Sequence, residues 1–242
     1  MAGSRVQCSA NSDGIAGYRR PMSEAHAPVP SPSAVIFDLD GTLVDTVEAR
    51  IRAWLTVFEQ EGIPADRSQV AVLIGLDGRR LAREVAETAG VSLAPGRDER
   101  IDARCGDIFA ELNARPSPLA GVSGALARIE AAGVPWAIAT SSRREQVAPS
   151  VEALGLARSP LIVDGSHVEH AKPAPDLLLL AAKELRADPA TCWYVGDATW
   201  DMRAATAAGM VPIGVTSGAV DASALREAGA RWVIASLADL EV

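Results

Sequence analysis

The sequence AVIFDLDGTLVD at residues 34–45 joins a short apolar run to two aspartates that are separated by one residue. The run predicts a β-strand over Ala34–Asp38. Alternate residues of an extended chain point to the same side, so the carboxylates of Asp38 and Asp40 are expected to converge on one ligand. Gly41 follows them and allows the chain to turn away from the strand. The stretch therefore predicts a ligand site at the end of a strand.

From Ser33 onward, short apolar runs alternate with longer amphipathic runs. This alternation is typical of a parallel sheet covered by helices, so we predict an α/β fold. Open sheets of this kind bind ligands at the carboxyl ends of their strands, where the two aspartates would lie. Further strands are predicted at Val134–Thr140, Leu161–Val163, Cys192–Val195, Val211–Val215 and Trp232–Ala235, and helices at Val122–Ala132, Glu145–Leu154, Pro175–Leu185 and Met202–Ala208.

About 90 residues separate the first predicted strand from the second, far more than one crossover helix needs. This interval contains helical patterns and no convincing strand. We therefore predict an inserted α-helical domain at residues 47–117, and an α/β core made of residues 33–46 and 118–242. The helices predicted inside the insertion are Val47–Gln60, Arg80–Ala89 and Arg100–Ala114.

Residues 1–32 are rich in Ser, Pro, Ala and Gly and show no periodicity, which predicts a disordered N-terminal extension. Met22 opens a shorter segment that leads directly into the fold. One hypothesis is therefore that the natural protein starts there and that residues 1–21 are not translated.

The composition indicates which partners and compartments to expect. The net charge is −8 with a pI near 5.0, which argues against nucleic acid as a partner. No apolar run approaches the length of a membrane span, and no apolar signal segment is visible, so we expect a cytoplasmic protein that does not bind a membrane. The cysteines Cys8, Cys105 and Cys192 are widely spaced and predict ordinary reduced thiols.

The string Phe37-Asp38-Leu39-Asp40-Gly41-Thr42 closely resembles the first signature motif of the haloacid dehalogenase superfamily. The resemblance implies a Rossmann-like parallel sheet of strand order 3-2-1-4-5 with a helical cap inserted after the first strand. It also implies that Asp38 attacks a phosphoryl group to form an aspartyl-phosphate. Asp40 would then protonate the leaving group and later activate water.

Two further segments resemble motifs of the same family. The strand that ends in Thr140, Ser141 and Ser142 resembles the second motif, which implies that Thr140 and Ser141 bind phosphate oxygens. The string KPAPD at residues 172–176 resembles the third motif. It implies that Lys172 neutralises the nucleophile and the transferred phosphoryl group.

The string GDATWD at residues 196–201 resembles the fourth motif and implies a Mg²⁺ site. Asp38 and Asp197 would supply carboxylate oxygens and Asp40 its main-chain carbonyl. Asp201 would lie behind them or bind through water, or it would simply begin a helix as its N-cap. Trp200 is expected to serve packing.

The resemblance leaves the substrate open. Arg79 and Arg80, in the predicted insertion, are candidates for binding an anionic substrate group, and Arg50 is a further candidate for binding the substrate. β-Phosphoglucomutase carries a histidine twelve residues after its nucleophile, and Arg50 occupies that place here. We therefore predict a phosphatase for a small phosphorylated metabolite, acting as a monomer or homodimer. A hexose phosphomutase is the alternative, and a phosphate-binding module without turnover is a further one.

Overall fold

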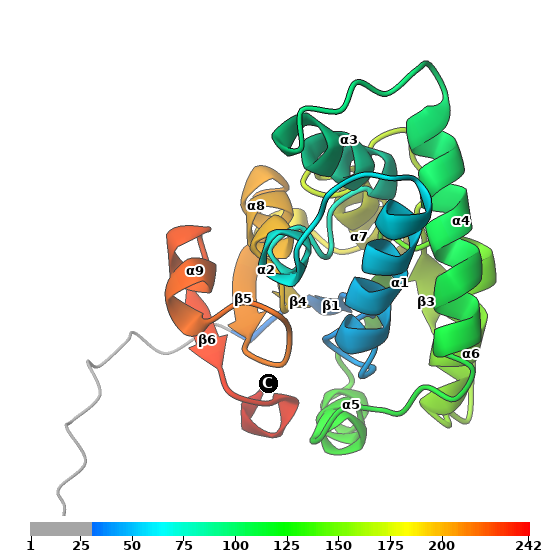
Figure 1. Cartoon of the computed structure of the whole chain (residues 1–242). Coiled ribbons are helices and arrows are strands. Elements are labelled where there is room, and N and C mark those ends of the chain that lie inside the picture. Colours follow the sequence, from blue (N-terminus) through cyan, green and yellow to red (C-terminus); the bar gives the residue numbers. More distant parts are fainter. Residues whose placement is uncertain (1–30) are drawn as a thin grey trace, which may run out of the picture. The chain divides into compact units, whose positions relative to one another are not determined.

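A sheet of six parallel strands organises residues 31–242, the part of the chain that this computed structural model describes (Figure 1). The strand order is β3-β2-β1-β4-β5-β6, which contains the predicted order and adds a sixth strand at one edge. The predictions of an N-terminal extension and of a start at Met22 fall largely on residues 1–30, outside the described residues. The strands are β1 (Ala34–Phe37), β2 (Trp136–Ala139), β3 (Leu161–Val163), β4 (Cys192–Gly196), β5 (Val211–Val215) and β6 (Trp232–Ile234).

The burial of the strands follows their place in the sheet. Every residue of β1 and of β4 is buried, because these central strands are covered on both faces. The edge strands β3 and β6 are partly exposed. A fully buried strand is a nearly continuous apolar run, which is why the sequence predicts these strands well.

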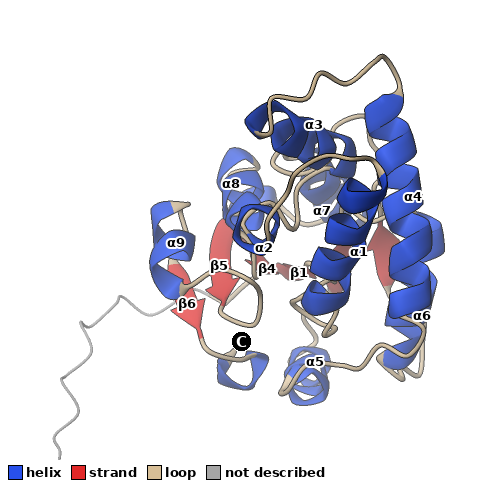
Figure 2. Cartoon of the chain, in the orientation of Figure 1, coloured by secondary structure: helices blue, strands red, loops and turns tan. Residues whose placement is uncertain are grey.

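Helices flank this sheet, while the segment between β1 and α5 contains helices and no strand (Figure 2). The predicted α/β fold is therefore confirmed. The helices are α1 (Val47–Gln60), α2 (Arg67–Ala71), α3 (Gly78–Thr88), α4 (Arg97–Leu112), α5 (Val122–Ala131), α6 (Arg144–Ala153), α7 (Asp176–Leu185), α8 (Thr199–Ala207) and α9 (Ala222–Glu227), with short 3₁₀ turns at Pro189–Thr191 and Leu237–Asp239.

Two boundaries differ from the prediction for clear reasons. β2 starts at Trp136 and not at Val134, because the N–H of Val134 donates to Ile129 at the end of α5. α8 starts at Thr199 and not at Met202, because the side chain of Asp201 accepts the N–H of Ala198 and so stabilises an earlier first turn. Asp201 is therefore not the N-cap residue of this helix.

Helices α1 to α4 gather around an apolar core of their own beside the sheet (Figure 1). Trp54, Phe58, Leu81 and Phe109 are among its buried side chains. Trp200 of α8 joins the same core, and its indole N–H donates to the carbonyl of Val72 at 3.1 Å. The expected packing role of Trp200 is thus confirmed. We refer to Val47–Leu112 as the helical insertion; the boundary at residue 117 stays a prediction.

No helix among residues 31–242 combines the length and the apolar character that crossing a membrane requires.

Candidate active site

Asp38 lies directly after β1, at the carboxyl end of a central strand. Its side chain is 4% exposed, and its main-chain N–H donates to the carbonyl of Val195 in β4 at 2.9 Å. The chain then turns at Gly41, whose φ of +83° lies in the left-handed region that favours glycine. The hydroxyl of Thr42 donates to Oδ1 of Asp197 at 2.9 Å. The turn after β1 is therefore tied to the end of β4.

Lys172 is the cation of this buried cluster. Its Nζ donates to Oδ1 of Asp38 at 2.5 Å, to Oδ1 of Asp201 at 2.8 Å and to the hydroxyl of Tyr194 at 3.2 Å. These oxygens match the three donors of an ammonium group. Burial alone would lower the pKa of Lys172, but the carboxylates of Asp201 and Asp38 outweigh it and raise the pKa well above its usual value. Lys172 therefore stays charged.

Three buried carboxylates, those of Asp38, Asp197 and Asp201, each place one oxygen within 4.8 Å of the others. Both oxygens of Asp201 are engaged, one by Lys172 and the other by the N–H of Ala198 at 2.9 Å. Asp38 and Asp197 each keep one oxygen that accepts no hydrogen bond from the residues that the structure describes. Mg²⁺ prefers such carboxylate oxygens. The donor set therefore fits a divalent cation held by Asp38 and Asp197, with Asp201 positioning Lys172.

The electrostatics of the cluster support the same interpretation. In the metal-free protein, burial raises the pKa of Asp38 to about 7; Lys172 opposes this shift and Asp201 adds to it. Burial, together with the carboxylates of Asp201 and Asp38, also raises the pKa of Asp197 well above its usual value. One lysine does not compensate three buried carboxylates, so the cluster has an excess of negative charge that a divalent cation would balance.

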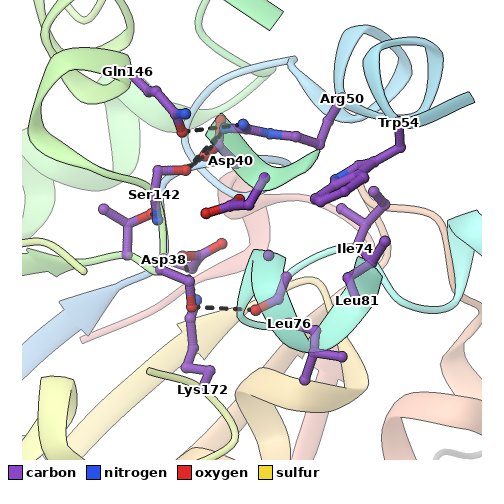
Figure 3. Close-up of a pocket in the computed structure, with 15 residues that line it drawn as sticks. Asp38, Asp40, Arg50, Trp54, Ile74, Leu76, Leu81, Ser142, Gln146 and Lys172 are labelled. Atoms are coloured by element: carbon purple, nitrogen blue, oxygen red, sulfur yellow. Dashed lines mark hydrogen bonds and ion pairs between the residues drawn. The ribbon is translucent and has the colours of Figure 1, made fainter. Parts of the chain in front are cut away.

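Asp40 belongs to a second network, at the wall of the same site (Figure 3). Its carboxylate accepts from Ser142 Oγ at 2.5 Å, from Thr46 Oγ1 at 2.7 Å and from the guanidinium of Arg50 at 3.1 Å. Burial alone would raise the pKa of Asp40, but Arg50 and the two hydroxyl groups outweigh it and lower the pKa below its usual value. Asp40 is therefore ionised in the protein without substrate.

The loop after β2 supplies hydroxyl groups. Thr140 is buried, and its Oγ1 accepts the N–H of Ser142 at 3.1 Å, so its own hydroxyl proton is available for another acceptor. Ser141 donates to the carbonyl of Gly75 in the helical insertion at 3.3 Å. Thr140 and Ser141 thus lie beside Asp38 and Lys172, with which they line one cavity.

Three polar residues of the site were not singled out by the sequence. Ser142 donates a hydrogen bond to Asp40, and the run of hydroxyl residues at 140–142 was the signal in the sequence that could have identified it. Gln146, in the first turn of α6, accepts from Arg50 at 3.2 Å. Tyr194 lies inside a buried strand, where its hydroxyl donates to the carbonyl of Ala139 at 3.1 Å. An apolar strand pattern gives no signal for such a hydroxyl.

A cavity opens above these groups, with about 490 Å³ of empty space including its mouth. Arg50 lines it, but Arg79 and Arg80 do not. Their side chains are 40% and 47% exposed, and they pair with Asp77 and Glu84, so the structure does not bring them to the site. The residues that line the cavity are Asp38, Asp40, Arg50, Trp54, Ile74, Gly75, Leu76, Gly78, Leu81, Asp102, Thr140, Ser141, Ser142, Gln146 and Lys172.

Comparison with known proteins agrees with this geometry. Residues 35–215 match the family model of haloacid dehalogenase-like hydrolases. The probable phosphatase IndB of Dickeya dadantii is 34% identical over 85% of this chain and 90% of its own length. The N-acetylmuramic acid 6-phosphate phosphatase of Pseudomonas aeruginosa is 34% identical over 73% of this chain and 78% of its own length. The crystal structure of a hydrolase from Pseudomonas syringae superposes with a TM-score of 0.81 at 32% identity, covering 85% of this chain and 94% of that one.

Proposed function

The chain belongs to the haloacid dehalogenase-like hydrolase family, and from this premise we propose that it is a magnesium-dependent phosphatase for a small phosphorylated metabolite. The observation that carries the proposal is the contact between Asp38 and Lys172 at the floor of the cavity. A buried carboxylate can act as a nucleophile, and the lysine beside it offsets the charge of an incoming phosphoryl group.

In the first step, one carboxylate oxygen of Asp38 attacks phosphorus and the bond from phosphorus to the ester oxygen breaks. Asp40 gives a proton to that oxygen, so the alcohol leaves neutral and an aspartyl-phosphate forms on Asp38. The low pKa of Asp40 means that it must first gain a proton. The negative charge of a phosphate ester nearby favours this protonation, because like charges raise the pKa of a carboxyl group.

In the second step, water attacks the phosphorus of the aspartyl-phosphate and Asp40 takes its proton. Inorganic phosphate leaves and Asp38 is regenerated. The hydroxyl of Thr140 and the loop at Ser141 hold phosphate oxygens, which places the phosphorus against Asp38. Lys172 stays protonated throughout, because Asp38 and Asp201 keep its pKa high.

Asp38, Asp197 and the main-chain carbonyl of Asp40 would hold the magnesium ion. When bound, this ion supplies positive charge that screens the phosphate from the surrounding carboxylates. The free oxygens of Asp38 and Asp197 support this assignment.

Arg50 favours hydrolysis over the phosphomutase alternative. A guanidinium group does not release its proton near neutral pH, so Arg50 cannot exchange protons as a histidine would at that place. Here it pairs with Asp40. The alternative of a module without turnover is disfavoured because the proposed nucleophile, acid and cation, Asp38, Asp40 and Lys172, line one cavity.

The test is release of phosphate from p-nitrophenyl phosphate with Mg²⁺, by wild type and by Asp38→Asn. We expect the variant to lose about 10³-fold or more in kcat, because it lacks the nucleophile. Asp45→Asn is the matched control, since Asp45 lies in the same segment but is exposed. A folded Asp38→Asn protein with activity close to that of wild type would refute the proposal.

A further inference from the structure

The part of the cavity that faces away from Asp38 is lined by the helical insertion. Trp54 comes from α1, Leu81 from α3, and Ile74 and Leu76 from the loop between α2 and α3. Figure 3 shows Trp54, Ile74 and Leu81 together on one side, across from Asp40, Ser142 and Gln146. The alcohol part of a substrate would therefore lie between an apolar wall and a polar one.

Among the described residues, the cations that line this cavity are Arg50 and Lys172. Lys172 is bonded to Asp38 and Asp201, and Arg50 to Asp40. Each of these cations already faces a carboxylate within hydrogen-bond distance. A substrate with a second anionic group would thus find no unpaired cation in the lining, and burial of an unpaired charge is unfavourable.

Asp102 adds a further carboxylate to the lining of the cavity. It lies on α4, its side chain is 18% exposed, and its Oδ2 accepts from Arg143 at 2.9 Å. Its Oδ1 accepts no hydrogen bond from the residues that the structure describes. This oxygen is therefore free to accept a hydrogen bond from a substrate.

Gly78, the first residue of α3, allows Asp102 to reach this place. A β carbon at position 78 would lie within 3.0 Å of both Oδ1 and Cγ of Asp102. The absence of a side chain at Gly78 thus leaves room for the carboxylate. Burial raises the pKa of Asp102 although Arg143 opposes the shift, which means that its negative charge is not fully compensated.

We infer that the substrate is the phosphate ester of an uncharged polyol, such as a sugar, and that Asp102 accepts a hydrogen bond from one of its hydroxyl groups. The carbon skeleton packs against Trp54 and its apolar neighbours. A second anionic group on the substrate is disfavoured, because Asp102 is near and the cations of the lining are paired. This inference rests on the proposed phosphatase function and adds the class of substrate and the residue that selects it.

The first experiment compares sorbitol 6-phosphate with 6-phosphogluconate, which has the same open-chain skeleton with a carboxylate in place of the terminal hydroxymethyl group. We expect wild type to prefer sorbitol 6-phosphate by at least about tenfold in kcat/KM. Equal values, or a preference for 6-phosphogluconate, would overturn the inference. This ranking needs no variant, so it decides the question even if substitutions at residue 102 prevent folding.

The second experiment uses Asp102→Asn, which removes the charge and frees Arg143. The ratio of the two kcat/KM values should fall by at least about tenfold, which is a larger change than in the kcat/KM for p-nitrophenyl phosphate, an ester without a sugar hydroxyl group. Asp107→Asn is the control, since Asp107 lies on the same helix and its side chain is 72% exposed. An equal loss on all three substrates would show that Asp102 serves structure only and would overturn its role.

The two proposals fail in different ways. If wild type releases no phosphate from any of the three esters with Mg²⁺, the phosphatase function itself is wrong. If p-nitrophenyl phosphate is cleaved but the preference for the uncharged polyol is absent, only the inference about the substrate is wrong.

Discussion

Gly218 lies so close to the carboxylate of Asp197 that a β carbon at position 218 would come within 3.0 Å of three atoms of the aspartate side chain. A β carbon at position 41 would likewise come within 3.0 Å of Oδ2 and Cγ of Asp197. Ser217 Oγ donates to the carbonyl of Gly41 at 2.6 Å and joins the two loops. The position of Asp197 is thus fixed by two close backbone segments.

Gly218→Ala should weaken magnesium binding. The φ angle of Gly218 is not in the left-handed region, so alanine adds little backbone strain there. The new methyl group must instead displace the side chain of Asp197. We expect the apparent affinity for Mg²⁺ to fall by about tenfold or more, as measured by the rise in thermal midpoint during a Mg²⁺ titration. Gly124→Ala in α5 is the matched control, because its nearest neighbour is the flexible end of Arg128 at 3.4 Å. An unchanged titration in Gly218→Ala would contradict this account.

Arg50→Gln should move the pH profile of the reaction. Removing the guanidinium takes away the largest influence that lowers the pKa of Asp40, so this pKa should rise. The limb of the kcat/KM profile against pH that follows the titration of Asp40 should then move to higher pH. The direction is the same whether the reaction requires the ionised or the protonated form of Asp40. The comparison is with Arg67→Gln, since Arg67 forms an exposed ion pair with Glu48. If the pH profiles of wild type and Arg50→Gln were the same, Arg50 would not lower the pKa of Asp40 and the prediction would be wrong.

Magnesium should stabilise the protein more at about pH 8 than at about pH 6. In the metal-free protein the pKa of Asp38 is raised to about 7, and that of Asp197 is raised as well. A carboxyl group with a raised folded-state pKa contributes stability at low pH and loses it as the pH rises through that value. The metal-free thermal midpoint should therefore fall across this range, while a bound cation offsets the loss.

The measurement is the thermal midpoint in chelator and in excess Mg²⁺ at both pH values. Asp197→Asn is the control, because it lacks a proposed ligand and should show little stabilisation by Mg²⁺ at either pH. If Mg²⁺ raised the thermal midpoint of wild type equally at both pH values, magnesium binding would not be coupled to the protonation of Asp38 and Asp197, and the prediction would be wrong.

Much of the fold could be predicted from the sequence because the central strands are buried on both faces. The bounds of β3, β5 and α1 agree with the prediction, since an apolar run or a helical period spans each of them. α2 was missed because its five residues are too short to show a period. The roles proposed for Asp38, Asp40, Lys172 and Asp197 rest on motifs at strand ends, which local sequence reveals.

The contacts between these motifs and the insertion could not be predicted in the same way. Asp102 reaches the cavity only because α4 packs against the start of α3, where Gly78 leaves space. The pairing of Arg50 with Asp40 depends on the rotamers of both side chains. Arg79 and Arg80 looked suitable for a substrate, but the structure leaves both outside the lining of the cavity, where they pair with Asp77 and Glu84 of their own segment. Such relationships follow from tertiary packing.

Lys172→Arg should damage the enzyme although it keeps the charge. Only Lys172 and Lys183 are lysines among 23 basic residues, so this chain uses arginine nearly everywhere else. The ammonium of Lys172 donates to three oxygens from one nitrogen, and its side chain is 1% exposed. A planar guanidinium is larger and directs its donors in a fixed fork, so it cannot occupy this space without displacing Asp38 or Asp201.

For Lys172→Arg we expect kcat/KM to fall by at least about tenfold, a loss of ~1.4 kcal/mol in transition-state stabilisation. Lys183→Arg, on the exposed side of α7, should have no effect. Steady-state kinetics with circular dichroism as a check on folding decide the matter, and a fully active Lys172→Arg enzyme would show that the site requires only a positive charge.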